Sequence, residues 1–240
     1  MALPDVASSG EWRKARLELL AHEKELTRHQ TAINAERRRL PMVRIDKKYV
    51  FEGPDGPVEL KDLFGDSRQL IIQHVMLGHD WDDACPGCTA GIDELAPGHL
   101  RHLSSRDTAF ALVSRAPFAK IAEVKERKGW FTPWYSAYGT DFNYDFQVSL
   151  DESRGQVEYN YRAEPGLLGG DRSSEMSGMS CFLRDGDNVF HTYSTYARGT
   201  EFLGNTYTFL DMTALGRQED WEEPKDRVPA VRGGDPTFTD

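Results

Sequence analysis

The sequence lacks several of the features that assign a function directly. No apolar run approaches the roughly 18 residues that a membrane-spanning helix needs. Basic residues are in the minority, with 29 Lys and Arg against 39 Asp and Glu, so the formal net charge is −10. Because phosphate groups are bound by a basic face, neither nucleic acid nor an anionic membrane surface is an expected partner.

Recognisable catalytic motifs and a disulfide framework are also missing. There is no Gly-x-x-x-x-Gly-Lys phosphate loop, no Gly-x-Ser-x-Gly elbow and no His-Glu-x-x-His pair. Three cysteines are too few for a small secreted scaffold. The first residues have no basic segment followed by an apolar one, the pattern of a secretory signal. We therefore expect a cytoplasmic protein whose thiols are reduced at rest.

The composition along the chain predicts three regions. Residues 1–42 read as a helical arm, with Ser9 as N-cap and an end near Leu40, before Pro41. Glutamates are interleaved with the arm's basic run, which predicts a solvated helix face and a homodimer contact. Residues 43–221 read as the folded domain, and the acidic residues 222–240 as a disordered tail.

Within the domain, buried strands alternate with helices. The expected strands are 43–52, 58–60, 69–76 and 107–114, and the expected helices are 89–96, 99–105 and 118–128. This order favours a parallel sheet with right-handed crossovers. Turn residues at 185–188 between two alternating apolar runs predict a hairpin of 180–184 with 189–194. Residues 151–180 read as a long loop, and 202–210 as a final helix.

Two cysteines lie between the expected strand 69–76 and the next helix, in the sequence Cys85-Pro86-Gly87-Cys88. If Cys85 is the N-cap, Pro86 falls at the first helical position, where its missing N–H costs nothing. The N–H groups and dipole of a first turn favour a negative sulfur, and a helix N-terminus lowers the pKa of a thiol. Cys85 is then the exposed attacking thiol, and Cys88, one turn inside, is the resolving thiol.

Several further stretches carry a family resemblance. They include Val113–Pro117, Gly129-Trp130, Pro133-Trp134, Gly139–Phe146 and His191–Gly199, extended by Glu36–Arg38, Leu40-Pro41, Asp211–Thr213 and Gly216-Arg217. With the β–α–β–α order and the Cys-x-x-Cys, the sequence resembles the DUF899 family over about residues 9–220. The resemblance implies an α/β thioredoxin-like fold: a central mixed sheet flanked by helices, with an N-terminal helical extension.

The resemblance also implies thiol–disulfide or peroxide chemistry, with no cofactor. Cys85 and Cys88 are the expected catalytic residues, and Arg115, after the second central strand, is expected to tune the thiolate. The partner is then a small-molecule or protein disulfide, or a peroxide. Ordinary thioredoxins have a proline before the first hairpin strand, where this sequence has Ser177–Cys181. Cys181 is therefore expected beside Cys85, in the substrate-binding region.

Two other readings remain open. Cys85 and Cys88 with the distant His191 form a possible site for copper or zinc, since thiolates select Cu(I) and an imidazole supplies a third ligand. Alternatively, aromatic side chains with Arg198 line a small-molecule pocket beside Cys85. The expected substrate-binding residues are Trp81, Trp134, Tyr193, Arg198 and Cys181. The competing interpretation is that most of these rings form the core.

Overall fold

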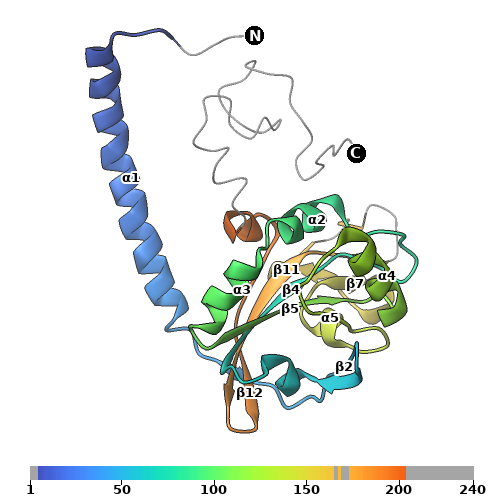
Figure 1. Cartoon of the computed structure of the whole chain (residues 1–240). Helices are drawn as coiled ribbons and strands as arrows, with labels where there is room; N and C mark the ends of the chain where they lie inside the picture. The colour runs from blue at the N-terminus through green and yellow to red at the C-terminus, as the bar shows by residue number, and fades with distance from the viewer. Residues whose placement is uncertain (1–4, 165–166, 169–172, 204–240) are drawn as a thin grey trace. The chain divides into compact units, whose positions relative to one another are not determined.

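The computed structural model describes residues 5–164, 167–168 and 173–203 (Figure 1). The described residues belong to two compact units, 5–41 and 42–203. In chain order the elements are α1 (Ser9–Arg37), β1 (Val43–Arg44), β2 (Val50–Gly53), β3 (Gly56–Glu59), η1 (Leu60–Phe64), β4 (Gln69–His74), α2 (Pro86–Asp93), α3 (Pro97–Ser104), β5 (Thr108–Ser114), α4 (Phe118–Lys128), β6 (Trp134–Ser136), α5 (Phe142–Asp145), β7 (Ser149–Asp151), η2 (Glu152–Arg154), β8 (Glu158–Tyr159), β9 (Arg162–Ala163), β10 (Ser173–Glu175), β11 (Gly178–Asp185), β12 (Asn188–Tyr196) and η3 (Ala197–Leu203).

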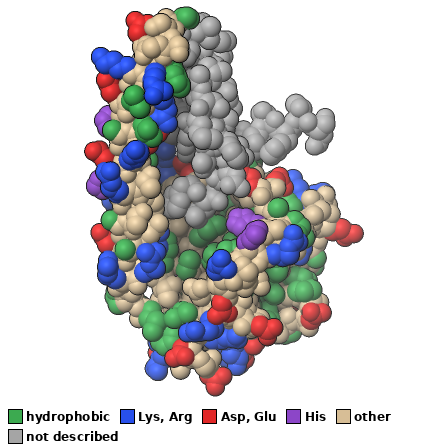
Figure 2. Space-filling view, turned by 60° about the vertical axis from the view of Figure 1, so that its left-hand side comes forward, with side chains coloured by type: hydrophobic (Ala, Val, Ile, Leu, Met, Phe, Trp, Pro, Cys, Tyr) green, Lys and Arg blue, Asp and Glu red, His purple; other side chains and the backbone are tan. Residues whose placement is uncertain are grey.

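The first unit contains the long helix α1. Its N-cap is Ser8 rather than the predicted Ser9: the Ser8 hydroxyl accepts the N–H of Glu11, and the Glu11 carboxylate accepts the N–H of Ser8. This reciprocal capping box is what selects the earlier serine. No residue of α1 is buried, and Figure 2 shows basic, acidic and apolar side chains mixed along it. None of the described helices has the length and apolarity needed to cross a bilayer.

The second unit is built on an eight-stranded mixed sheet in the order β1-β12-β11-β4-β5-β6-β2-β3. Its centre is β4, which pairs in parallel with β5 on one side and antiparallel with β11 on the other (Figure 1). The chain crosses from β4 to β5 through α2 and α3. A β–α–β crossover followed by the antiparallel hairpin β11–β12 beside its first strand is the thioredoxin-like arrangement, and the predicted fold class is confirmed.

The predicted strand 43–52 is wrong as a single element. Its first part, β1, pairs with β12 at one edge of the sheet. Its second part, β2, pairs with β3 and β6 at the other edge. Tyr49 and Phe51 are buried beneath the sheet against Phe142, so the chain passes across one face between the two strands. A continuous apolar run predicts strand structure but not which partner each part takes.

Each face of the sheet carries its own apolar cluster. Alternate residues of β4, such as Leu70 and Ile72, pack on one face with η1 and α5. On the opposite face Leu112 of β5 packs with Ile121 of α4 and with Cys88 of α2. The cysteine pair is therefore built into the second cluster.

The segment between β6 and β11, residues 137–177, is here called the insertion. The sequence predicts a loop over most of it, but its described residues form α5, η2 and the short strands β7 to β10. A third apolar cluster joins it to β12 through Tyr159 and Tyr196, whose ring centroids lie 5.6 Å apart. The strands are two or three residues long and carry no alternation long enough to predict.

Some sequence predictions fall outside the described residues. These are the acidic tail 222–240, most of the helix 202–210, and the family-like residues 211–217. Before them, the 3₁₀ helix η3 follows β12 directly.

Candidate active site

Cys85 is the N-cap of α2, as predicted, with Pro86 at the first helical position. Its backbone is extended, with φ −52° and ψ 137°, and its N–H donates to the Met76 carbonyl at 3.0 Å. Because Met76 lies just beyond β4, this bond closes residues 77–84 into a loop whose two ends meet. The side chain of Cys85 is half-buried, so its sulfur lies at the margin of the second apolar cluster.

Cys88 lies one turn inside α2 and is buried. Its sulfur accepts the Met76 N–H at 3.4 Å and is hydrogen-bonded to the Cys85 thiol. That thiol–thiol hydrogen bond is the largest influence on Cys88, followed by burial, and both hold its pKa well above the ordinary range. The two sulfurs are not joined in a disulfide, so the pair is in its reduced form.

The loop 77–84 is held by cationic side chains of α4. The Lys120 ammonium donates to two loop carbonyls, those of His79 at 2.8 Å and Trp81 at 2.7 Å. About two turns further along α4, Arg127 donates to the Asp82 carbonyl at 3.2 Å. Backbone carbonyls that no strand or helix satisfies are thus satisfied by side chains, which fixes the path of the chain into Cys85.

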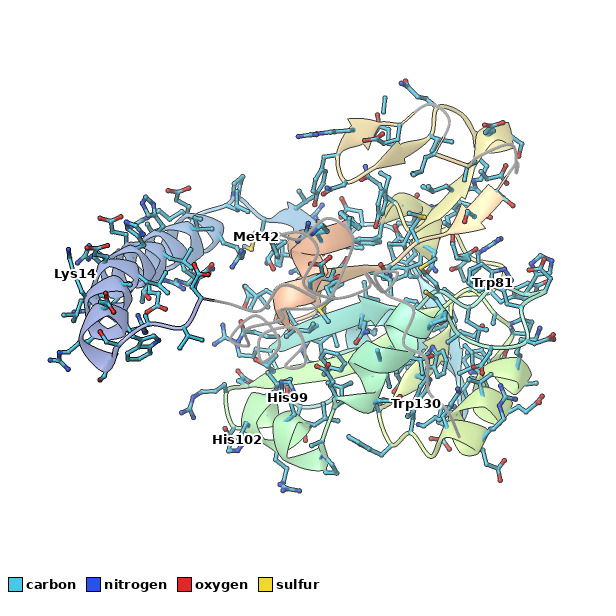
Figure 3. The ribbon with its side chains drawn as sticks, turned by 90° about the horizontal axis from the view of Figure 1, so that it is seen from above. Lys14, Met42, Trp81, His99, His102 and Trp130 are labelled. Atoms are coloured by element: carbon cyan, nitrogen blue, oxygen red, sulfur yellow. The ribbon has the colours of Figure 1, made fainter. Side chains whose placement is uncertain are left out.

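Two tryptophans from different loops belong to this region, Trp81 from the loop before α2 and Trp130 from the residues after α4 (Figure 3). Trp81 is half-buried and, like Cys85, packs against the cluster that contains Cys88. Trp130 is buried, and its indole N–H donates to the Asp93 carboxylate at the end of α2 at 2.7 Å. Of the predicted substrate-binding residues, Trp81 is the one that joins the cysteine cluster while keeping an exposed part.

Trp134 is a core residue, so its predicted place in a substrate pocket is corrected. It is 2% exposed, and its indole N–H donates to the Ser114 hydroxyl at 2.9 Å. That hydroxyl in turn donates to the Val75 carbonyl at 2.8 Å. Trp134 therefore connects β6, β5 and the end of β4 from inside the protein.

Arg115 lies at the end of β5, at the same edge of the sheet as the cysteines, but its contacts are with the insertion. Its guanidinium donates to the Glu175 carboxylate at 2.6 Å and to the Tyr144 hydroxyl at 2.7 Å. Burial raises the pKa of Glu175, against the hydrogen bond from Ser149 and the charge of Arg115. Arg115 thus anchors the insertion to the sheet through a largely buried ion pair.

The strand register separates Cys181 from the pair. Cys181 lies opposite Ile71 of β4 on one side and Tyr193 of β12 on the other. Met76, which binds both pair cysteines, is five residues beyond Ile71, or about 17 Å at about 3.3 Å per residue. The expected placement of Cys181 and its neighbour Tyr193 beside Cys85 is therefore corrected. Arg198 is exposed in η3 and forms an ion pair with Glu201 at 3.3 Å.

His191 is on the wrong face of the sheet to share a metal with the cysteines. It lies opposite Phe182 in the β11–β12 ladder, and its ring packs against Phe146 and Phe182 in the first cluster. Cys88 packs in the second cluster, on the other face. Within the part of the chain that the structure describes, no three His, Cys, Asp or Glu side chains gather as a metal site would need. The predicted Cys85–Cys88–His191 site is therefore wrong.

Many of the aromatic side chains pack against one another. Tyr49, Phe51, Phe142 and Phe146 form edge and tilted contacts at centroid distances of 4.6–6.3 Å. One described cavity, of about 200 Å³, lies within the insertion. Its lining residues are Glu152, Gly155, Gln156, Val157, Ala163, Glu164 and Leu168. Of the rings expected in a pocket beside Cys85, Phe142 belongs to the group around Tyr49, and Trp134 packs against Trp130 in the second cluster at a centroid distance of 5.6 Å. For these rings the expected pocket is replaced by core packing.

Sequence reasoning missed two residues close to the cysteines. Lys120 lies on the polar face of an amphipathic helix, where a solvated role is the ordinary expectation. Tyr159 comes from the insertion, and its hydroxyl bonds to the carbonyl of Ser177 and the N–H of Ala197, both at 3.0 Å. Burial is the largest influence that raises the pKa of Tyr159, and the nearby Cys88 adds to it when its thiol is ionised. No pattern in the sequence links these positions.

Comparison with solved structures finds peroxiredoxins among the similar chains. A peroxiredoxin Q mutant from Xanthomonas campestris matches at 14% identity and a TM-score of 0.45, covering 65% of this chain and 87% of that one. The peroxidoxin BcpB from Mycobacterium tuberculosis matches at 16% identity and a TM-score of 0.44, covering 66% and 86%. A search of curated proteins finds no match.

A family model covers almost the whole chain. The model described as "Bacterial protein of unknown function (DUF899)" matches residues 1–232. That span contains both cysteines, the complete sheet and α1, as the resemblance in the sequence predicts. The chain is therefore a member of the DUF899 family.

Proposed function

We propose that this protein is a dithiol–disulfide oxidoreductase in which Cys85 attacks and Cys88 resolves. One observation carries the proposal. Cys85 is at a helix N-cap with part of its side chain exposed, and the buried Cys88 lies one turn away with its thiol hydrogen-bonded to that of Cys85. A sulfur at a helix N-terminus is the position at which a thiolate is favoured. The buried partner is within reach to close a disulfide.

The electrostatics of the pair support this division of roles. The pKa of Cys88 is raised, first by its hydrogen bond with Cys85 and then by burial, which favours its protonated form. We therefore assign the attacking thiolate to Cys85, at the N-terminus of α2. The Cys85 thiolate attacks one sulfur of a substrate disulfide, forming a mixed disulfide and releasing the other half as a thiolate. Cys88 then loses its proton and displaces the second half. The dithiol is oxidised by two electrons, and the substrate becomes two thiols.

The Met76 backbone forms a hydrogen bond with each cysteine, and both bonds have a role in these steps. Its N–H donates to the Cys88 sulfur, which stabilises that sulfur as it becomes anionic before the second displacement. Its carbonyl holds the Cys85 N–H and thereby the first turn of α2. A small hydroperoxide is a second substrate for the same thiolate: Cys85 takes one oxygen to become a sulfenic acid, an alcohol leaves, and Cys88 closes the disulfide with loss of water.

Thiol titration with single substitutions tests the proposal. Mild oxidation of the reduced wild-type chain removes two of its three thiols, and reduction restores them. Neither Cys85→Ser nor Cys88→Ser shows a reversible intramolecular loss of two thiols. Cys181→Ser is the matched control and still loses two, because Cys181 lies away from the pair.

The same samples are assayed for metal. Copper or zinc bound in stoichiometric amount and protecting Cys85 and Cys88 from oxidation would contradict the proposal. So would two thiols that remain unoxidised in the wild-type chain while Cys181 reacts.

A further inference from the structure

The backbone that leads into β11 lies next to the cysteine pair. Gly178 is opposite His74 in the antiparallel ladder, so the register sets Ser177 opposite Val75. The next residue along the chain is Met76, whose N–H and carbonyl bind Cys88 and Cys85. Residues 175–177, which lead into β11, are therefore the backbone beside which a polypeptide substrate on Cys85 would lie.

These residues end the insertion, and their backbone groups are already bonded to earlier parts of it. β10, which ends at Glu175, pairs antiparallel with β7. The Met176 N–H donates to the Val148 carbonyl at 2.8 Å, and the Ser177 carbonyl accepts the Tyr159 hydroxyl at 3.0 Å. An extended peptide joins a protein edge by pairing with unbonded N–H and C=O groups. Here Val148 and Tyr159 of the chain itself already bond to the groups with which such a peptide would pair.

Apolar packing fixes the insertion over this edge. Tyr159 is 7% exposed and packs with Val148, Leu150 and Tyr196. Gly178 admits the Tyr196 ring so closely that a Cβ at this position would lie 2.6 Å from a ring carbon. Arg115 adds the buried ion pair with Glu175. Exposing residues 175–177 to a peptide would separate all of these contacts.

We propose that the cysteine pair reduces low-molecular-weight disulfides rather than protein disulfides, because the insertion occupies the backbone edge on which a polypeptide would pair. The inference rests on the proposed function and narrows its substrate class. The chemistry is unchanged: Cys85 forms a mixed disulfide with one half of the small substrate, Cys88 displaces that half, and two small thiols leave. The substrate needs access to one sulfur only, at the exposed part of Cys85.

Trapping of the mixed disulfide tests the inference. A Cys88→Ser/Cys181→Ser chain has Cys85 as its one thiol, and mass spectrometry follows its reaction with hydroxyethyl disulfide and with insulin. Each rate is divided by the rate of free cysteine with the same disulfide. We expect the normalised rate with insulin to be lower by about tenfold, because the packed insertion excludes the polypeptide on either side of an insulin disulfide, an obstacle that free cysteine does not have.

The outcomes separate the two proposals. Equal normalised rates would overturn the substrate class and leave the dithiol function standing. No reaction with either disulfide would overturn both.

A pair of tyrosine variants in the same background tests the cause. Tyr159→Ala removes the hydroxyl that bonds to the Ser177 carbonyl and the buried ring that covers this edge, so the preference for the small disulfide should fall by about 5-fold. Tyr161→Ala is the control, because Tyr161 is exposed and its hydroxyl bonds to the Ser194 carbonyl instead. Identical preferences in the two variants would overturn the assignment to this edge.

Discussion

At the scale of single residues, a chain of hydrogen bonds crosses β4, β11 and β12. It runs from His74 Nε2 to the Ser180 hydroxyl at 2.8 Å, on to the Ser194 hydroxyl at 2.8 Å, and to His191 Nε2 at 2.7 Å. Two hydroxyl protons cannot make three bonds, so one imidazole must donate. His191 also bonds to the backbone of Tyr193, which assigns its proton to the other ring nitrogen. His74 is therefore the donor.

This assignment explains why His74 stays neutral. Its other ring nitrogen is buried and has no hydrogen-bond partner among the described residues. Protonation would place a second N–H there, against the rings of Phe142 and Phe146. Burial, helped by the proximity of His191, lowers the pKa of His74 to about 3.

The lowered pKa predicts acid destabilisation. An unfolded histidine titrates near 6.5, so the neutral His74 stabilises the fold fully above that pH and progressively less as the pH falls toward 3. Between pH 6.5 and 4 we expect a loss of roughly 3 kcal/mol from this residue, at about 1.36 kcal/mol per pH unit. Urea unfolding at several pH values measures it.

The comparison for this prediction is His74→Phe with Ser180→Ala, which removes the titrating group and its nearest partner together. The double variant should lose less stability over the same pH range. Equal slopes in the two proteins would show that other groups carry the acid sensitivity.

At the scale of single elements, local signals place helix ends well. Pro86 at the first position of α2 and Gly129 after α4 are both where the sequence predicts them. Gly129 has φ +68°, a left-handed conformation that side chains with a Cβ rarely adopt. Local signals fail for strand pairing, because the partners of β1 and β2 are far away along the chain.

Two glycine-to-alanine substitutions should have opposite effects on stability, because Gly129 has a left-handed backbone and Gly10 has a helical one. A Cβ would meet nothing within 4 Å at either Gly129 or Gly10, so only the backbone conformation differs. Gly129→Ala should cost about 1 kcal/mol of unfolding free energy, read from the urea midpoint. Gly10→Ala, inside α1, should raise the helical circular dichroism signal, because alanine favours helix by about 1 kcal/mol. A neutral Gly129→Ala would contradict the left-handed cap.

At the scale of the whole molecule, the two units differ in whether apolar packing within the unit stabilises them. The sheet unit has three apolar clusters of its own. The helix α1 has no buried residue and carries exposed apolar side chains, at Trp12, Leu19, Leu26 and Ile33. An exposed apolar stripe on a long helix fits the predicted homodimer contact, which stays a prediction.

Removal of residues 1–41 tests the independence of the sheet unit and the dimer together. The truncated chain keeps β1, so we expect its thermal midpoint to stay within about 3 °C of the full chain, a change below about 1 kcal/mol. Sedimentation should give a dimer for the full chain and a monomer for the truncated one. Leu19→Glu with Leu26→Glu in the full chain is the control and should also give a monomer. The same oligomeric state for all three proteins would remove the helix from the dimer interface.

The sequence by itself determined the order of the elements from β4 to α4, the thioredoxin-like fold class and the cysteine pair at the start of α2. These depend on residues that are neighbours along the chain: an apolar strand, a proline and a helix start. Tertiary structure alone decided which residues surround the pair. Arg115 binds Glu175 across 60 positions, and Tyr159 reaches Ser177 from a segment without a periodic pattern. His191 is excluded from the pair because strand register sets the face of the sheet, and no local signal specifies register between distant strands.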